Sequence, residues 1–511
     1  MSRKLQQRSR NLKRRIEHRL RPIDWENQDS PMISASNVHY EVAEKTRGIN
    51  VGGIGAIQLL ANRVGLPSAI NGALRVLKRH LPYWESDHVL NIAFNTMCGG
   101  TCLEDIELRR NDEVFMDAMG AQRIPDPTTA GDFCRRFNEG DVESLMNAIN
   151  DCRLKVWEQQ PDEFFEQAII EADGTVVPTT GECKEGMDFN YHKKMWGHHP
   201  LVVSLANTSE PLFLVNRTGN RPSSEGAAAR FDQALDLVRR AGFRRVLFRG
   251  DTDFSQTAYL DGWNREGVEF VFGMDAHPNL VGIAGSLPRP AWKALVREPK
   301  HEVKTEERAR PENVKERVVE EREYRNLRLV KEDVAEFSYR PGKCKREYRM
   351  VVLRKTIDVE QGQLVLFTEH KYFFYITNVK RMTAAQVVKN SNQRCNQENL
   401  IAQLKSLRAL HSPVDTLVSN WAYMVMASLA WSLKAWYALS LPVSGRWREK
   451  HEAEKSAVLK MEFRTFLNEF IRLPAQIVLT GRRIVFRLLG WSRWQDVFLR
   501  GATAIRGPNL C

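Results

Sequence analysis

The chain has 511 residues, of which 42% are hydrophobic and 27% charged, and its formal net charge is +12 at pH 7. This length and composition exclude a disordered chain and a small single domain, and they predict about two to four domains. The eight cysteines include no C-x-x-C pair. We therefore expect neither a zinc ribbon nor a thioredoxin motif, and instead buried thiols in a reducing cytoplasm.

The positive charge is concentrated at the two ends of the chain. Residues 1–21 carry nine lysines or arginines, among them Arg14 and Arg15, against one acid, and residues 441–511 carry thirteen against six. The residues between these ends are close to neutral overall. Basic ends on a neutral body favour arms that neutralise DNA phosphates, with solubilising tails as the alternative.

The N-terminal part reads as a basic arm followed by helices. Residues 1–46 form the arm and a polar connector, in which no apolar run follows the basic residues, so we expect no secretory signal. Residues 47–160 show apolar residues at three- and four-residue spacing, which predicts a helical region that we interpret as DNA-binding. Residues 416–433 carry no charge but several polar side chains, which favours a buried core helix over a membrane span.

Short β-branched runs appear near residue 167 and predict an α/β fold. Over residues 165–275 the order is β-β-β-α-β-α-β, which indicates a mixed sheet with helices packed on it. Residues 276–370 are predicted to be a β-rich insertion, although residues 306–326 could be helical. Residues 371–440 are predicted to return to the core, and residues 441–511 form a basic C-terminal region.

The strand "YFFYITN" is expected to rejoin the central sheet and to lead into one long helix from Thr383, its N-cap, to Leu407. Arg394, Glu398 and Lys405 lie four and seven residues apart in this helix, which places them on one face. A surface Arg–Glu pair with a nearby lysine is the plain alternative, and such a pair contributes only about 0.3–0.5 kcal/mol.

Three carboxylates occupy related positions in this pattern. Asp173 lies at the end of the first predicted strand, Asp251 at the end of the fourth, and Glu398 on the helix after the sheet. Acids at the ends of core strands lose solvation, and shared Mg²⁺ or Mn²⁺ ions would compensate for that loss. Glu171 and Asp253, each two residues from one of these aspartates, compete for the same role.

The segments "EADGTVVPTTG", "RVLFRGDTDFS" and "NQRCNQENLIAQLKSL" together resemble the DDE transposases of bacterial insertion sequences. That resemblance implies a ribonuclease-H-like core with a β-rich insertion and a Y-x2-R-x3-E-x6-K signature. Arg394, Glu398 and Lys405 match its last three letters, whereas Ser391 stands at the tyrosine position. Ser391 keeps a hydroxyl group but loses the ring that would contact DNA near the cleavage site.

By this resemblance, Asp173, Asp251 and Glu398 would be catalytic and would bind two Mg²⁺ (or Mn²⁺) ions. Arg394 and Lys405 would hold the DNA backbone. The resemblance further implies that the protein cuts terminal inverted repeats and joins the 3′-hydroxyls to target DNA, passing through a hairpin at the transposon end, as a homodimer in a paired-end complex. It also implies a cytoplasmic, nucleoid-associated bacterial protein without a membrane partner.

The segment "YHKKMWGHHPL" adds basic residues next to the first strands. A zinc site there would need a fourth ligand at suitable spacing, so a loop that touches DNA phosphates through Lys193 and Lys194 is favoured. Two alternatives to a transposase remain open: a metal-dependent DNA nuclease without strand transfer, and a DNA-binding protein that descends from a transposase and has lost catalysis.

Overall fold

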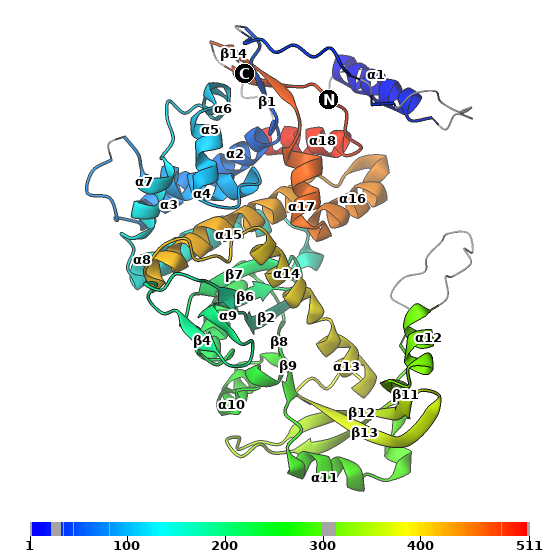
Figure 1. The fold of residues 1–511 in the computed structure, drawn as a ribbon. Helices are drawn as coiled ribbons and strands as arrows, with labels where there is room; N and C mark the ends of the chain where they lie inside the picture. The colour runs from blue at the N-terminus through cyan, green and yellow to red at the C-terminus, as the bar shows by residue number, and fades with distance from the viewer. Residues whose placement is uncertain are drawn as a thin grey trace.

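The protein is described by a computed structural model covering residues 3–21, 32–33, 35–43, 45–80, 82–297, 313–481 and 483–507. Helices from the front and the C-terminal parts of the chain lie at one end of the molecule (Figure 1). The longest strands lie at the opposite end, and the strands that carry the predicted acids lie between the two ends.

The helical end is built around one long buried helix, α15 (Leu417–Leu439). Thr416 caps α15 by accepting a hydrogen bond from the backbone amide of Ser419, and α15 packs against α2, α4, α7, α8, α16 and β7. The predicted core helix is therefore confirmed. None of the helices in the described ranges is both long and apolar enough to cross a membrane. The front helices are α2 (Ile54–Arg63), α3 (Leu66–Ala73), α4 (Glu85–Met97), α5 (Glu107–Arg110), α6 (Glu113–Met119), α7 (Pro127–Cys134) and α8 (Glu139–Trp157).

The C-terminal region folds back onto the front helices. A small antiparallel sheet in the order β1-β14-β15 joins the two parts, and α18 packs against α2. The N-terminal helix α1 (Arg3–Arg19) lies beside this region (Figure 1). The other elements here are β1 (Gly48–Ile49), α16 (Arg448–Lys460), α17 (Phe463–Phe466), β14 (Ala475–Thr480), β15 (Arg483–Leu488) and α18 (Gln495–Arg506).

A nine-stranded mixed sheet forms the centre of the molecule, in the order β10-β11-β12-β13-β9-β8-β2-β6-β7. The pairs β2–β8 and β8–β9 are parallel and the other pairs are antiparallel. Runs such as "VLFRG" are buried along their whole length, as expected for strands covered on both faces. The core elements are β2 (Ala168–Gly174), β6 (Leu201–Leu205), β7 (Glu210–Val215), α9 (Ala227–Ala241), β8 (Val246–Gly250), α10 (Thr257–Arg265) and β9 (Glu269–Met274).

The predicted α/β class and the predicted run of strands and helices are confirmed by this sheet. A second small sheet, in the order β3-β5-β4, follows β2 and was not predicted. It consists of β3 (Val177–Pro178), β4 (Asp188–Asn190) and β5 (Met195–His198). Of these, β4 and β5 fall within or beside the histidine-rich loop of the sequence.

The β-rich segment forms three long strands that extend the central sheet. Only the last residues of β13, Phe374–Thr377, pair with β9, and the neighbouring parts of β11 and β12 pack against α13. The far end of the ribbon projects beyond the core (Figure 1). Because β13 is continuous, it crosses the position between residues 370 and 371 where the insertion was expected to end. The elements are α11 (Pro278–Ser286), β10 (Lys293–Ala294), α12 (Val314–Glu321), β11 (Arg325–Tyr339), β12 (Tyr348–Gln361) and β13 (Leu364–Thr377).

The single helix predicted from Thr383 to Leu407 is wrong, because the structure contains two helices. Thr383 caps α13 (Ala384–Asn392), as predicted, and α14 (Cys395–Ser406) follows after a break at Gln393 and Arg394. The residues "NSNQ" before the break have side chains that compete with helical hydrogen bonds. Arg249 of β8 stabilises the break, since its Nη1 donates to the carbonyl of Asn390 at 2.9 Å.

Candidate active site

The two aspartates are brought together by the parallel pairing of β2 with β8. Glu171 of β2 lies opposite Arg249 of β8 in this pairing, so both strands end at the same edge of the sheet. Asp173 lies near the end of β2, and Asp251 directly follows β8. The carboxyl ends of adjacent parallel strands are a common place for functional side chains in open α/β sheets.

The third carboxylate, Glu398, comes from the first turn of α14, which packs against β2. A negative charge is stabilised at this end of a helix by the unpaired backbone amides and the helix dipole. A buried glutamine fixes α14 in place: Gln397 accepts a hydrogen bond from Ser204 and donates one to the carbonyl of Val202 at 3.0 Å. Sequence reasoning missed Gln397, although a polar residue among the apolar positions of a helix is a signal for such an anchor.

Arg394 lies at the centre of the three carboxylates. Its Nη2 is 3.1 Å from Oε1 of Glu398, and its Nη1 is 3.5 Å from Oδ2 of Asp251 and 4.0 Å from Oδ2 of Asp173. The three acids and the arginine named from the sequence therefore meet at one place. The surface-pair alternative does not describe this geometry, because two of the three contacts are to residues far away in the sequence.

These side chains line an open cleft of about 770 Å³. Lys405, Lys193 and His199 also line it, so two of the predicted cations face the same space as the acids. Asp253 lines the cleft too and is exposed, and its backbone amide donates to Oδ1 of Asp251 at 3.1 Å.

The carboxylates that line the cleft outnumber its lysines and arginine, and the two aspartates are largely buried. Burial, followed by the charge of Asp251, raises the pKa of Asp173 from 3.8 to about 7. Burial also raises the pKa of Asp251, and Arg394 opposes that rise. Burial and the charge of Lys193 lower the pKa of Lys405. One arginine therefore does not compensate the aspartates fully, and the site favours an additional positive charge.

The donor set suits a hard divalent cation, because all three acids present carboxylate oxygens. In this structure the guanidinium of Arg394 lies between the acids. The described residues contain no group of three or more histidine, cysteine, aspartate or glutamate side chains close enough to hold a metal ion. The raised pKa of Asp173 is the observation that fits a cation, since a bound cation would remove the cost of ionising a buried carboxylate.

The stability of the metal-free protein should depend on the protonation of Asp173. Between about pH 4 and 7 the folded state keeps a proton that the unfolded state has released, so the free energy of unfolding should fall as the pH rises through this window. Asp173→Asn removes this pH-dependent contribution to the free energy of unfolding. Urea unfolding in the presence of a chelator should therefore show a variant that gains stability relative to wild type from pH 4 to pH 8. If the free energy of unfolding changed with pH in the same way in wild type and Asp173→Asn, the raised pKa of Asp173 would be contradicted.

The competing acid Glu171 has a structural partner. Its Oε1 lies 2.6 Å from Nε of Arg249, and both side chains are buried. Burial raises the pKa of Glu171, whereas Arg249 lowers it. Because Arg249 also holds the end of α13, Glu171 stabilises the helix break that positions Arg394.

Other predicted residues lie outside the cleft. Lys194 is exposed and adopts a left-handed backbone conformation (φ 52°), and it does not line the cleft. Ser391 is buried on α13 and lines a smaller neighbouring cavity of about 370 Å³ together with Tyr375 and Arg394. Arg14 and Arg15 are exposed on α1, at the other end of the molecule (Figure 1).

The two consecutive histidines near β5 have partners of their own. His198 contacts Oγ of Ser412 through Nδ1 at 2.8 Å and the carbonyl of Glu185 through Nε2 at 3.0 Å. Nδ1 of His199 contacts the carbonyl of Arg221 at 2.6 Å. These contacts fix the loop, whose residues Lys193 and His199 line the cleft, and they give the histidines a structural role.

Carboxylates from two adjacent strands and a following helix meet in one cleft, which is the arrangement expected of a DDE enzyme. The sequence matches the family model described as Transposase DDE domain group 1 over residues 41–508, and the chain belongs to this family. Transposases of this family bind DNA, cut it and transfer it, and they generally use divalent metal ions. The predicted membership of the DDE transposases is thereby confirmed, whereas an origin in a bacterial insertion sequence stays a prediction.

Among solved structures, the chain is similar to the cryo-EM structure of a piggyBac transposase synaptic complex with hairpin DNA. The identity is 11%, the TM-score is 0.33, and the similarity covers 82% of each chain. No curated protein matches the sequence.

Proposed function

We propose that this protein is a transposase that binds the terminal inverted repeats of an insertion sequence, cleaves the DNA at these ends and joins the 3′-hydroxyls to target DNA. The observation that carries the proposal is the convergence of Asp173, Asp251 and Glu398 on Arg394 within one cleft that Lys193 and Lys405 also line. In this proposal the three acids are the catalytic residues.

A ribonuclease-H-like core is part of the proposal and is supported by the strand order. Strands β2, β6 and β7 form an antiparallel meander. Its first strand, β2, pairs in parallel with β8, and β8 pairs in parallel with β9. The two aspartates then stand on the two adjacent central strands. The long ribbon β11–β13 follows β9 in the chain, between Asp251 and Glu398, where the β-rich insertion was expected.

We assign the metal-binding role to the same three carboxylates. Asp173 would contribute to both sites, with Asp251 and Glu398 each completing one site for Mg²⁺ or Mn²⁺. When bound, the two ions would supply Lewis-acid activation of the attacking oxygen and stabilise the charge on the leaving oxygen. The protein contributes the fixed positions of its carboxylates and a cleft whose walls carry positive charge.

Arg394 and Lys405 bind the DNA backbone in this proposal, and Lys193 extends the positive wall of the cleft. Because Arg394 is paired with the three acids in the absence of metal, cation binding would release its guanidinium for a phosphate. Lys405 is held in the same cleft with a lowered pKa, and a phosphate would favour its charged form.

We assign recognition of the transposon ends to the helical region 47–160 and the basic arm. We further propose that the functional assembly is a homodimer that pairs two transposon ends. The positive charge of residues 1–21 and the exposure of Arg14 and Arg15 support a role for the arm in binding these DNA ends. Ser391 is buried and lines a neighbouring cavity together with Arg394. It would contact DNA only when that cavity opens to the cleft.

The test is an assay of cleavage and strand transfer in Mg²⁺, using linear DNA that carries the sequences flanking the gene. The proposal expects cuts at the inverted repeats, joined products with a target plasmid, and no cuts in DNA with scrambled ends. Cutting without joined products would favour the nuclease alternative. Binding of the DNA ends without any cutting would favour the alternative of a DNA-binding protein that descends from a transposase and has lost catalysis.

A further inference from the structure

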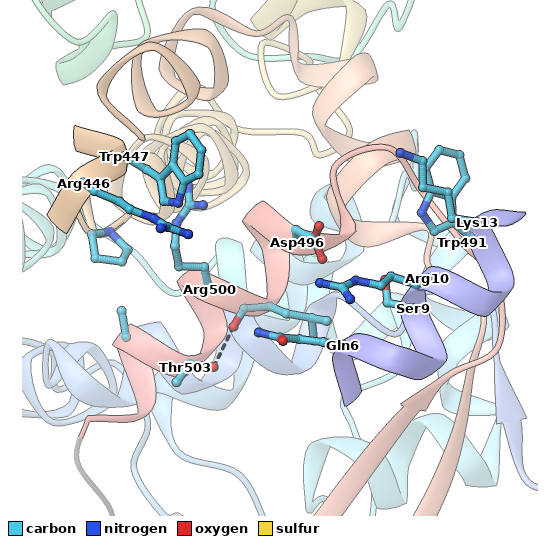
Figure 2. Close-up of a pocket in the computed structure, with 13 residues that line it drawn as sticks. Gln6, Ser9, Arg10, Lys13, Arg446, Trp447, Trp491, Asp496, Arg500 and Thr503 are labelled. Carbon is cyan, nitrogen blue, oxygen red and sulfur yellow. Dashed lines mark hydrogen bonds between the residues drawn. The ribbon is translucent and has the colours of Figure 1, made fainter. Parts of the chain in front are cut away.

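A second large cleft lies far from the three carboxylates, between the N-terminal helix α1 and the C-terminal helix α18 (Figure 2). Its volume is about 780 Å³, the same size as the candidate active site. Three segments that are distant in the sequence form its walls: α1, residues 442–447, and residues 491–504. The fold thus assembles a concave surface that no single segment could provide.

The walls of this cleft carry more positive than negative charge. Arg10, Lys13, Arg446 and Arg500 line it, and within the described ranges Asp496 is the one carboxylate that does so. Lys13 pairs with Glu17 and Arg500 pairs with Glu454, at 3.5 and 2.6 Å. In the described part of the chain, Arg10 and Arg446 form no ion pair.

Two tryptophans face the same space from opposite sides, next to cations (Figure 2). Trp447 is 55% exposed, and the guanidinium of Arg446 lies 5.0 Å from its ring centroid. Trp491 is half-buried, with Nζ of Lys13 at 6.0 Å from its ring centroid. A large apolar ring left exposed beside an arginine that forms no ion pair within the described residues suits a ligand with a flat face and negative charge.

An unpaired nucleotide has both of these features. Its base offers a face for stacking on an indole, and its phosphate offers a charge for an arginine. A DNA duplex offers phosphates but keeps its base faces inside the stack, so it would leave Trp447 unused. The volume of the cleft is in the range that holds a drug-sized ligand, which is enough for one or two nucleotides.

We propose that the cleft between α1 and α18 binds an unpaired segment of a DNA strand, with a base stacked on Trp447 and the adjacent phosphates held by Arg446 and Arg10. The choice of DNA as the ligand rests on the proposed transposase function. The site itself is separate from the catalytic cleft and shares no residue with it. Binding would also tie α1 to the body of the protein, because Arg10 and Lys13 belong to that helix.

The test measures the binding of a fluorescent oligothymidylate of about ten nucleotides by anisotropy, in the presence of a chelator. The full chain carries Glu398→Gln so that no DNA is cut. Trp447→Ala should weaken binding by about tenfold or more, whereas Trp447→Phe should restore most of the affinity because phenylalanine still stacks. Arg446→Gln should weaken binding and flatten its salt dependence.

The matched control is Tyr259→Ala, which removes an exposed aromatic ring (47%) that stacks on Trp263 and lines neither of the two clefts. This variant should bind the oligothymidylate as the parent does. A hairpin duplex of the same length should be bound equally by the parent and by Trp447→Ala. Inorganic pyrophosphate, which has no base, should compete poorly with the oligothymidylate.

Three results would overturn the proposal: unchanged binding by Trp447→Ala, an equal loss for the duplex, or full competition by pyrophosphate. The last two would indicate a site for phosphates alone. Because the assay detects binding by a chain that cannot cut, its outcome does not depend on whether the wild-type protein cleaves transposon ends. Failure of one proposal can therefore be told apart from failure of the other.

Discussion

Asp173→Asn, Asp251→Asn and Glu398→Gln are each expected to reduce DNA cutting by at least about 10³-fold. Each substitution removes the negative charge of a proposed metal ligand but keeps the size and a hydrogen-bonding group of the side chain. Losses in a site that acts as a unit are not additive, so the double variant Asp173→Asn/Asp251→Asn should be no worse than the single variants. The measurement is single-turnover cutting of labelled ends in Mg²⁺.

The matched control for these variants is Asp253→Asn. Asp253 lines the same cleft and is exposed, and its carboxylate forms no ion pair with Arg394 in the described structure. It should retain cutting within about tenfold of wild type, which corresponds to about 1.4 kcal/mol in the barrier. End binding, measured with chelator, should be similar in all four single variants. Wild-type cutting by any of the first three would remove that residue from the catalytic set.

The largest effect on stability is expected at Glu210, which lies at the start of β7 and is fully buried. Its carboxylate accepts hydrogen bonds from Nε of Arg153 at 3.0 Å and from the indole nitrogens of Trp157 and Trp436 at 3.1 and 2.8 Å. Arg153 and Trp157 belong to α8 and Trp436 belongs to α15. The carboxylate therefore ties the front helices and the core helix to the central sheet.

Glu210→Ala should destabilise the protein by about 3–5 kcal/mol, because it leaves the buried guanidinium of Arg153 without its counter-charge. The measurement is the free energy of unfolding in urea. Glu225→Ala, which removes an exposed partner of Arg221, is the control and should cost no more than about 0.5 kcal/mol. A loss at Glu210 as small as that of the control would mean that the buried network does not hold these parts together.

The strands that carry the aspartates could be predicted because their composition departs sharply from that of the helical front. Runs such as "VLFRG" are short, apolar and followed by a turn, so both their type and their ends are visible in the sequence. The close approach of Asp173 to Asp251 depends on the parallel pairing of β2 with β8, and the order of strands along the chain did not reveal that pairing.

The position of Arg394 could not be predicted in full. Spacing placed it near Glu398 but could not place it between the two aspartates, which depends on the break between α13 and α14. That break is held by Arg249, a residue of β8 that is 141 positions away from Asn390. The polar run "NSNQ" is a weak local signal for the break, and the hydrogen bond that fixes it comes from a distant part of the chain.

Two other features depend on long-range contacts in the same way. Glu210 follows a polar turn in the sequence and looks like an exposed acid, yet its partners come from α8 and α15. The cleft beside Trp447 joins the two ends of the chain, and neither basic end shows its partner in its own composition.

Asp251→Cys in the end-cutting assay shows whether Asp251 is a metal-binding catalytic residue, as we propose. The thiolate is a poor ligand for Mg²⁺, whereas Mn²⁺ accepts softer ligands more readily. We expect no cutting by this variant in Mg²⁺ and a measurable return of cutting in Mn²⁺, while wild type cuts in both. Cutting at the wild-type rate in Mg²⁺ would contradict this proposal.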